Sequence, residues 1–277
     1  MYDFYMHGML NYEDDINILI ANKEYSNQWT DKATFSYDYT DPRLTQLRKK
    51  YALEDIAGVG DDFIKLLRIT FWLSKHLKFG APHSTESFHA LDVIEKSIDG
   101  YESNCYIAAT VLVECFLSMG FVARMVRCMP IDLRFNECHC VAIAFIQDYK
   151  KFVAFDASMG GCYINEFGIP LSLAEIRNAI IEGSKINLRS IYHSDYVKNF
   201  KFYLSKNLVR FQSLKNTTYG NAIAENRNIM INLNPVCFPL KDKICSQNEK
   251  IIQHIFISND DLFWETNLSK FNKIVSN

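Results

Sequence analysis

An apolar segment at residues 105–119 constrains the fold of this chain more than any other feature of the sequence. After its first residues, the strongly polar side chains in it are Thr110, Glu114 and Ser118, which recur every four residues. This spacing predicts a helix with one narrow polar stripe on an otherwise apolar cylinder. Such a helix has to be buried on most sides, so other elements must pack around it in more than one layer.

The sequence around this segment predicts its neighbours. Ser103 or Asn104 can cap the start of the helix, and Gly120 stands where a glycine commonly ends one. After Gly120 the pattern changes to that of strands rich in Val, Phe and Ile. The predicted strands are 121–128, 138–146 and 151–156. Helices before a strand-rich region, with mixed elements after it, are typical of an α+β protein.

Composition marks no boundary between domains. The chain has 6 Pro and 11 Gly in 277 residues, with no repeat, no low-complexity tract and no long flexible linker. We therefore expect an irregular N-terminal lead-in at 1–43, a core at 44–160, and a mixed α/β extension at 161–277 that packs on the core.

Charge and hydropathy exclude several classes of partner. The 30 Lys and Arg residues against 32 Asp and Glu give a formal net charge of −2, so there is no basic surplus to bind nucleic acid or an anionic membrane. Apolar stretches such as 141–146 are too short to span a bilayer, and no basic region followed by an apolar run stands at the N-terminus. We expect a cytoplasmic protein whose eight cysteines are free thiols.

One of these cysteines, Cys105, has the position that favours a reactive thiolate. It opens the predicted helix, where free backbone N–H groups and the helix dipole stabilise a negative charge and lower the pKa of a thiol. Cys115, in the middle of the same helix, lacks this advantage. A thiolate nucleophile also needs a base beside it and a third group that orients the base.

His139 and Asp156 meet this need through the predicted hairpin. If Ile146 pairs with Lys151, then Val141 lies opposite Asp156. His139, two residues from Val141, points to the same face and becomes a diagonal neighbour of Asp156, about 7 Å away between Cα atoms. A shift of the register by one residue would place the two side chains on opposite faces of the sheet.

Residues 102–124 resemble the nucleophile segment of the transglutaminase-like superfamily. The pattern of that family is a Cys opening a helix, a small or apolar run, and then a Gly-φ-x-Ala-Arg strand, here Gly120-Phe-Val-Ala-Arg124. A His beginning one strand and an Asp ending the next follow, as do His139 and Asp156. The separations of 34 residues from Cys to His and 17 from His to Asp are similar to those of the family. The resemblance covers about residues 45–160.

The resemblance implies a papain-like, transglutaminase-type core and a Cys-His-Asp triad. Cys105 would attack a carbonyl, His139 would act as general base and then as general acid, and Asp156 would hold the imidazole. The implied partner is a peptide or amide substrate, or an acyl ester. No Trp follows Cys105, so we expect hydrolysis, as in a cysteine peptidase. An amine-accepting acyltransferase and a catalytically idle peptide-binding module remain the alternatives.

Two further roles follow from the resemblance. The family places the side chain of its oxyanion hole upstream of the Cys, where Trp72, His83 and His89 are candidates. The backbone N–H of Cys105 would be the second donor. We expect Arg124 to have a structural role rather than to bind substrate.

A metal site is the rival chemistry. Cys138, His139 and Cys140, together with Cys128 and Cys162, superficially resemble a zinc cluster. Side chains alternate along a strand, however, so His139 points away from its two neighbours and the three cannot converge on one ion. The sequence also has no C-x-x-C pair. We therefore expect neither a metal nor another cofactor.

Overall fold

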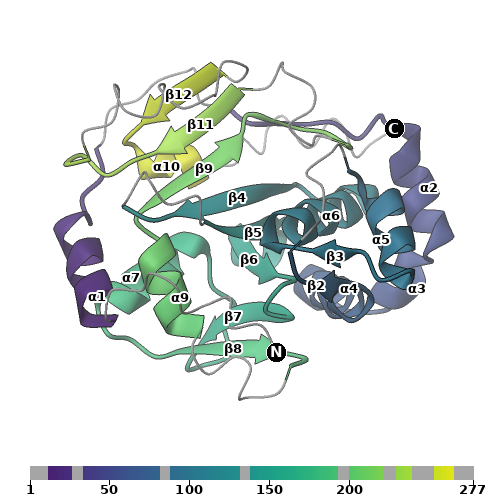
Figure 1. Ribbon diagram of the computed structural model, residues 1–277, viewed down its shortest axis with the longest axis horizontal. Coiled ribbons are helices and arrows are strands. Elements are labelled where there is room, and N and C mark those ends of the chain that lie inside the picture. Colours follow the sequence, from purple (N-terminus) through teal and green to yellow (C-terminus); the bar gives the residue numbers. More distant parts are fainter. Residues whose placement is uncertain are drawn as a thin grey trace.

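The computed structural model describes residues 12–26, 34–81, 88–131, 138–192, 200–220, 229–238 and 253–264. Within these residues the protein has mixed α/β architecture around an eight-stranded sheet (Figure 1). The strands of this sheet are β4 (Ala123–Met129), β5 (His139–Ile146), β6 (Lys151–Asp156), β7 (Gly161–Asn165), β8 (Ile186–Ser190), β9 (Arg210–Leu214), β11 (Ile229–Leu233) and β12 (Gln253–Ile257). Their order across the sheet is β12-β11-β9-β4-β5-β6-β7-β8. Neighbouring strands are antiparallel except β11 and β12.

The apolar segment forms helix α6, Cys105–Ser118, and all of its residues from 107 to 118 are buried. One side of α6 packs on β4 and β5, and other helices cover its opposite side (Figure 1). The helices of this layer are α2 (Pro42–Lys50), α3 (Leu53–Ala57), α4 (Asp62–His76) and α5 (Ala90–Ile98). Two short strand pairs lie outside the main sheet: β1 (Ser36–Tyr37) with β10 (Asn216–Thr217), and β2 (Lys78–Phe79) with β3 (Glu102–Ser103). The burial predicted for the helix at 105–119 is confirmed in α6.

The polar stripe of α6 binds backbone groups. Thr110 and Ser118 donate to carbonyl groups of their own helix. The carboxylate of Glu114 accepts the N–H of Ala90 at 2.6 Å and that of Gly220 at 2.9 Å, and burial raises its pKa to about 8. The stripe thereby joins α6 to the start of α5 and to the segment that follows β10.

A second layer of helices covers the other face of the sheet. Its members are α1 (Tyr12–Ala21), α7 (Leu173–Ile181), α9 (Phe200–Asn207) and α10 (Asp260–Trp264). Residues of β5 alternate between the two layers, because Cys140 and Ala142 pack with the α6 layer while Val141 and Ile143 pack with the second. A strand that is buried on both faces is apolar at successive positions, as the sequence of β5 is.

The predicted hairpin register is confirmed. Ile146 pairs with Lys151, and Ala142 pairs with Phe155. A single 3₁₀ turn at Gln147–Tyr149 joins the two strands. This register places the start of β5 beside the end of β6.

The N-terminal segment differs from the irregular lead-in predicted for 1–43. It contains α1 and β1, and α2 begins at Pro42. Ile16 and Leu19 of α1 pack into the same apolar cluster as residues of α7 and α9. Its first turn is acidic, with Glu13, Asp14 and Asp15, and its apolar partners come from much later in the chain.

The strands that follow residue 160 belong to the same sheet as those of the predicted core. β7 and β8 extend the sheet beyond β6, while β9 pairs with β4 and carries β11 and β12 on its other side. The 44–160 and 161–277 segments therefore share one sheet. Among the described residues, no helix combines the length and the apolar character needed to cross a bilayer.

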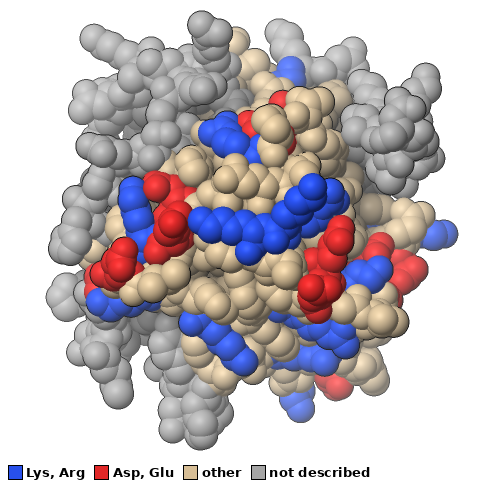
Figure 2. Space-filling view, turned by 90° about the vertical axis from the view of Figure 1, so that its right-hand side faces the viewer, with Lys and Arg blue, Asp and Glu red and all other residues tan. Residues whose placement is uncertain are grey.

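The face of the molecule formed by the α6 layer carries charges of both signs. Figure 2 shows its Lys and Arg side chains interspersed with Asp and Glu. Lys50 pairs with Glu95 at 3.0 Å, and Lys96 pairs with Asp92 at 2.8 Å. Exposed pairs of this kind contribute about 0–1 kcal/mol each. The stability of this layer therefore depends mainly on the apolar contacts beneath it.

Arg124 has the structural role predicted for it. Its side chain is fully buried, and it donates to the hydroxyl of Tyr37 at 2.8 Å and to the carbonyl oxygen of Phe263 at 2.5 Å. The guanidinium carbon lies 4.0 Å from the ring centroid of Phe35 and 4.3 Å from that of Phe152. This one side chain joins the N-terminal segment, the sheet and α10.

We predict that Arg124→Lys lowers the free energy of unfolding by about 3 kcal/mol, because a buried ammonium cannot keep both hydrogen bonds and the ring contacts. Urea titration followed by circular dichroism measures the loss. Arg48→Lys, at a partly exposed arginine, is the matched control and should change stability by less than about 0.5 kcal/mol. Equal effects of the two substitutions would contradict the structural role of Arg124.

Candidate active site

Cys105 is the first residue of α6, as the sequence predicts. Asn104 caps the helix by accepting the N–H of Ile107 at 3.0 Å, which decides between the two predicted caps. The side chain of Cys105 is partly exposed, and its thiol donates to the carbonyl oxygen of Cys138 at 3.5 Å. The nucleophile predicted from the sequence therefore lies against the start of β5.

The structure brings His139 and Asp156 into direct contact. Nε2 of His139, at the start of β5, lies 2.5 Å from Oδ2 of Asp156, at the end of β6. Both side chains are almost completely buried. The pair occupies the diagonal position that the hairpin register predicts, on the face of the sheet that α9 covers.

Other donors hold the carboxylate of Asp156 in place. The Ser158 hydroxyl at 2.6 Å and the Met159 N–H at 3.1 Å donate to Oδ1, and the Tyr163 hydroxyl donates to Oδ2 at 2.6 Å. Sequence reasoning did not find these residues. Ser158 and Met159 follow Asp156 in the tight turn before β7, so a turn prediction could have found them, whereas Tyr163 becomes a neighbour only through the pairing of β6 with β7.

The buried pair carries opposite charges. Burial alone would lower the pKa of His139, but the charge and hydrogen bond of Asp156, together with Cys105, raise it to about 10. Burial alone would raise the pKa of Asp156, but His139, Ser158 and Tyr163 hold it below its usual value. Near neutral pH the pair is therefore an imidazolium and a carboxylate.

This charge acts on Cys105. A hydrogen bond from the Cys140 thiol lowers the pKa of Cys105 well below its ordinary value; burial opposes that shift, and His139 adds to it. Burial raises the pKa of Cys115 in the same helix. Nδ1 of His139 is buried and makes no hydrogen bond of good geometry within the described part of the chain. It is the ring atom that remains to exchange a proton with the thiol.

Tyr203 and Arg127 complete the surroundings of these groups. The ring of Tyr203, on α9, meets the His139 ring edge-on with centroids 4.9 Å apart, and its hydroxyl donates to the carbonyl oxygen of Cys138 at 3.4 Å. The guanidinium carbon of Arg127, on β4, lies 5.0 Å from the ring centroid of Tyr106. The sequence placed Tyr203 among the aromatic side chains of a predicted helix that could pack on the core, but Arg127 was not found from the sequence, because it reaches the site through the pairing of distant segments.

The structure gives two of the upstream candidates for the oxyanion hole other contacts and does not describe the third. Trp72 packs between Tyr51 and His76, with ring centroids 5.6 and 4.7 Å away. His89 caps α5 by accepting the N–H of Asp92. His83 lies outside the described residues.

The cysteines proposed as a rival zinc cluster are divided between the two faces of the sheet. Cys140 and Cys162 pack with the α6 layer, whereas Cys128 packs with the second layer. Within the described ranges, no three His, Cys, Asp or Glu side chains are grouped to hold a metal ion.

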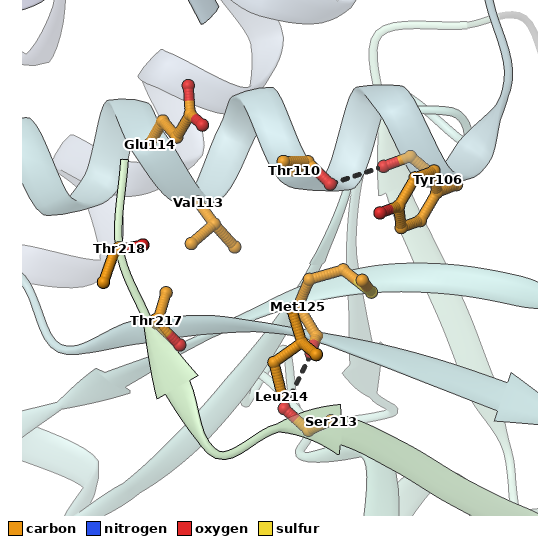
Figure 3. Close-up of a pocket in the computed structure, with 9 residues that line it drawn as sticks. All are labelled: Tyr106, Thr110, Val113, Glu114, Met125, Ser213, Leu214, Thr217 and Thr218. Atoms are coloured by element: carbon orange, nitrogen blue, oxygen red, sulfur yellow. Dashed lines mark hydrogen bonds between the residues drawn. The ribbon is translucent and has the colours of Figure 1, made fainter. Parts of the chain in front are cut away.

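A separate pocket lies along the flank of α6 (Figure 3). Tyr106, Thr110 and Glu114 line it from the helix, and Met125 and Ser213 line it from the sheet. Ser213 donates to the carbonyl oxygen of Met125 at 2.8 Å. The pocket begins beside Tyr106, the residue after Cys105, and extends away from that cysteine along the helix.

Comparison with known proteins does not assign this chain to a family, so any functional assignment depends on its own residues. No family model matches it, and no curated protein does. Among solved structures it is similar to "a putative cysteine protease from Cytophaga hutchinsonii", with 17% sequence identity and a TM-score of 0.35. The match covers 52% of this chain and 47% of the other, so it spans about half the length of that protein. A similarity of this size establishes neither a common fold nor a function.

We predict that iodoacetamide alkylates Cys105 at pH values below about 8.5, the pKa of a free thiol. The reason is that the Cys105 thiol loses its proton at a lower pH than an ordinary cysteine does. His139→Ala should move the profile toward higher pH, since the neighbouring positive charge is lost. Peptide mass mapping follows each cysteine, with the exposed Cys237 as the control in the same chain. Identical profiles for Cys105 and Cys237 would rule out an activated thiol.

We predict that Tyr163→Phe lowers the free energy of unfolding by about 2 kcal/mol, because it removes a hydrogen bond to a buried carboxylate. The loss should grow as the pH rises from the acid range, where Asp156 is protonated, to neutral pH. Urea titrations at both pH values measure it. Tyr149→Phe, on an exposed side chain, is the matched control. A loss independent of pH would contradict the role assigned to the Tyr163 hydroxyl.

Proposed function

We propose that this protein is a thiol-dependent acyl-transfer enzyme that hydrolyses a peptide or amide bond with Cys105, His139 and Asp156 as its triad. One observation carries the proposal. A partly exposed thiol at the N-terminus of a buried helix lies beside a buried imidazolium–carboxylate pair, and its pKa is lowered there. A structural cysteine needs no such pair, whereas a nucleophile does.

The geometry supports a two-step reaction. The Cys105 thiolate attacks the substrate carbonyl, and the backbone N–H groups at the start of α6 stabilise the oxyanion. The His139 imidazolium, through Nδ1, protonates the leaving amine as the bond to nitrogen breaks. The neutral imidazole then takes a proton from water, which attacks the thioester and releases the acid and the thiol. Asp156 holds the ring through Nε2 and stabilises its positive charge.

The finer assignment is a papain-like core of the transglutaminase type. Three features support it: a helix that starts with the nucleophile, an antiparallel sheet packed against that helix, and the chain order of Cys, His and Asp. The His and Asp occupy the start and the end of neighbouring strands. The arrangement is compatible with that fold, and the same site would serve an amine acceptor in place of water.

The experiment that tests the function is turnover of a fluorogenic peptide library by the wild-type protein, Cys105→Ala and His139→Ala. We expect turnover by the wild type. The turnover rate should fall by at least about 10³-fold in each variant, because the Cys105 thiol and the His139 imidazole act only together. Cys237→Ala, at an exposed cysteine, is the matched control and should retain activity.

The outcomes separate the alternatives. Turnover that requires an added amine, detected with hydroxylamine as acceptor, would replace hydrolysis with acyl transfer to amines. Saturable peptide binding without turnover would make the protein a binding module. An active Cys105→Ala protein would overturn the proposal altogether.

A further inference from the structure

Arg127, on β4, is a charged residue beside the candidate site that the proposed reaction does not use. It pairs with Cys140 of β5 on one side and with Gln212 of β9 on the other. Side chains two residues apart on a strand share a face of the sheet, and Met125 of β4 packs with the α6 layer. The side chain of Arg127 therefore lies on the face of the sheet that α6 covers.

The guanidinium of Arg127 contacts the first turn of α6. Its central carbon lies 5.0 Å from the ring centroid of Tyr106, the residue that follows Cys105. The Cys105 thiol in turn donates to the carbonyl oxygen of Cys138, two residues before the strand partner of Arg127. The guanidinium and the nucleophile thus lie at the same end of the helix, the end that carries its free N–H groups.

Arg127 differs from the fully buried arginines of the described chain in what its donors bind. Arg124, Arg177 and Arg210 each donate to a backbone carbonyl oxygen. Among the described residues, Arg127 has neither a carbonyl acceptor nor a carboxylate partner, and its buried Nε makes no hydrogen bond. A charge held in this way is costly unless a ligand supplies the missing acceptors. The side chain is partly exposed, so a ligand can reach it.

We propose that Arg127 binds a carboxylate group of the substrate, so that the enzyme prefers peptides with an acidic group beside the bond that Cys105 attacks. A guanidinium presents its N–H donors in a planar fork that fits both oxygens of a carboxylate. Asp and Glu side chains and the C-terminus of a peptide all offer this group. The inference rests on the proposed function and names its substrate class.

The charges of the site agree with an anionic substrate. The imidazolium of His139 is already paired with Asp156, so its charge is balanced within the protein. The charge of Arg127 is balanced by no carboxylate of the described chain, and the N-terminal end of the α6 dipole adds to it. A substrate carboxylate would supply the missing negative charge on the α6 side of the sheet.

The test compares peptides that differ only in one charge. One pair of fluorogenic peptides carries Glu or Gln beside the scissile bond, and a second pair has a free carboxylate or a carboxamide at its C-terminus. In the wild type we expect kcat/KM to be at least about 10-fold higher for the acidic member of one of these pairs, the gain that a charge-assisted hydrogen bond gives. The pair that shows the preference identifies which carboxylate Arg127 binds.

Variants of Arg127 show whether this residue causes the preference. In Arg127→Gln the ratio should fall to about one through loss of the acidic peptide alone, because the amide has no charge to pair with the carboxylate. Arg127→Lys should keep only part of the preference, since an ammonium lacks the planar fork. Arg189→Gln, at an exposed arginine on β8 at the far edge of the sheet, is the matched control and should keep the preference.

Four results would overturn the proposal. The first two are a wild type without preference in either pair and an Arg127→Gln protein that retains the preference. The third is an equal loss of acidic and neutral turnover, which would make the role of Arg127 structural. The fourth is a shift of Cys105 alkylation to higher pH in Arg127→Gln with the ratio unchanged, which would make it a group that stabilises the thiolate. If Arg127→Gln does not fold, as judged by circular dichroism, an undiminished preference in Arg127→Lys decides against the proposal.

Binding without turnover keeps this test separate from the proposed function. The same acidic and neutral peptides, labelled with a fluorophore, are titrated with Cys105→Ala and with Cys105→Ala carrying Arg127→Gln, and fluorescence anisotropy gives each Kd. Tighter binding of the acidic peptide that depends on Arg127, in a protein whose wild type turns over no peptide, would support the carboxylate site and refute the hydrolase. Turnover without any acidic preference would support the hydrolase and refute the role of Arg127.

Discussion

Burial of α6 on both sides is the constraint from which the rest of the structure follows. The helix is apolar around most of its circumference, so it needs the sheet on one side and a layer of helices on the other. Its polar stripe then binds backbone groups of α5 and of the segment after β10. With the helix held in this way, its first residue, Cys105, is fixed against the start of β5.

The charges of the site are stable because each has a partner. Removing an imidazolium and a carboxylate from water costs several kcal/mol per ion, and only good geometry with additional hydrogen bonds repays that cost. Asp156 receives those bonds from His139, Ser158, Met159 and Tyr163. The resulting positive charge on His139 is then available to Cys105. The turn after β6 is therefore as much a part of the site as the strand that precedes it.

Local patterns predicted much of this arrangement, and long-range pairing accounts for what they missed. The helix at 105–119 and the register of the hairpin depend on periodicity and on a short loop, which a sequence displays directly. The helix α1 was missed, and its apolar residues pack against α7 and α9, which come much later in the chain. Tyr203 and Arg127 come to the site through contacts between segments far apart in the chain, and no local pattern encodes such contacts.

Arg124 has a further consequence for the order in which the molecule assembles. The carbonyl group that it binds belongs to Phe263, 139 residues later in the chain. During synthesis on a ribosome, the guanidinium on β4 therefore remains without this acceptor until α10 has emerged. Contacts of such long sequence separation form late and slow the folding of the chain. The nascent protein thus completes the apolar cluster on this side of the sheet only after residue 263 has emerged.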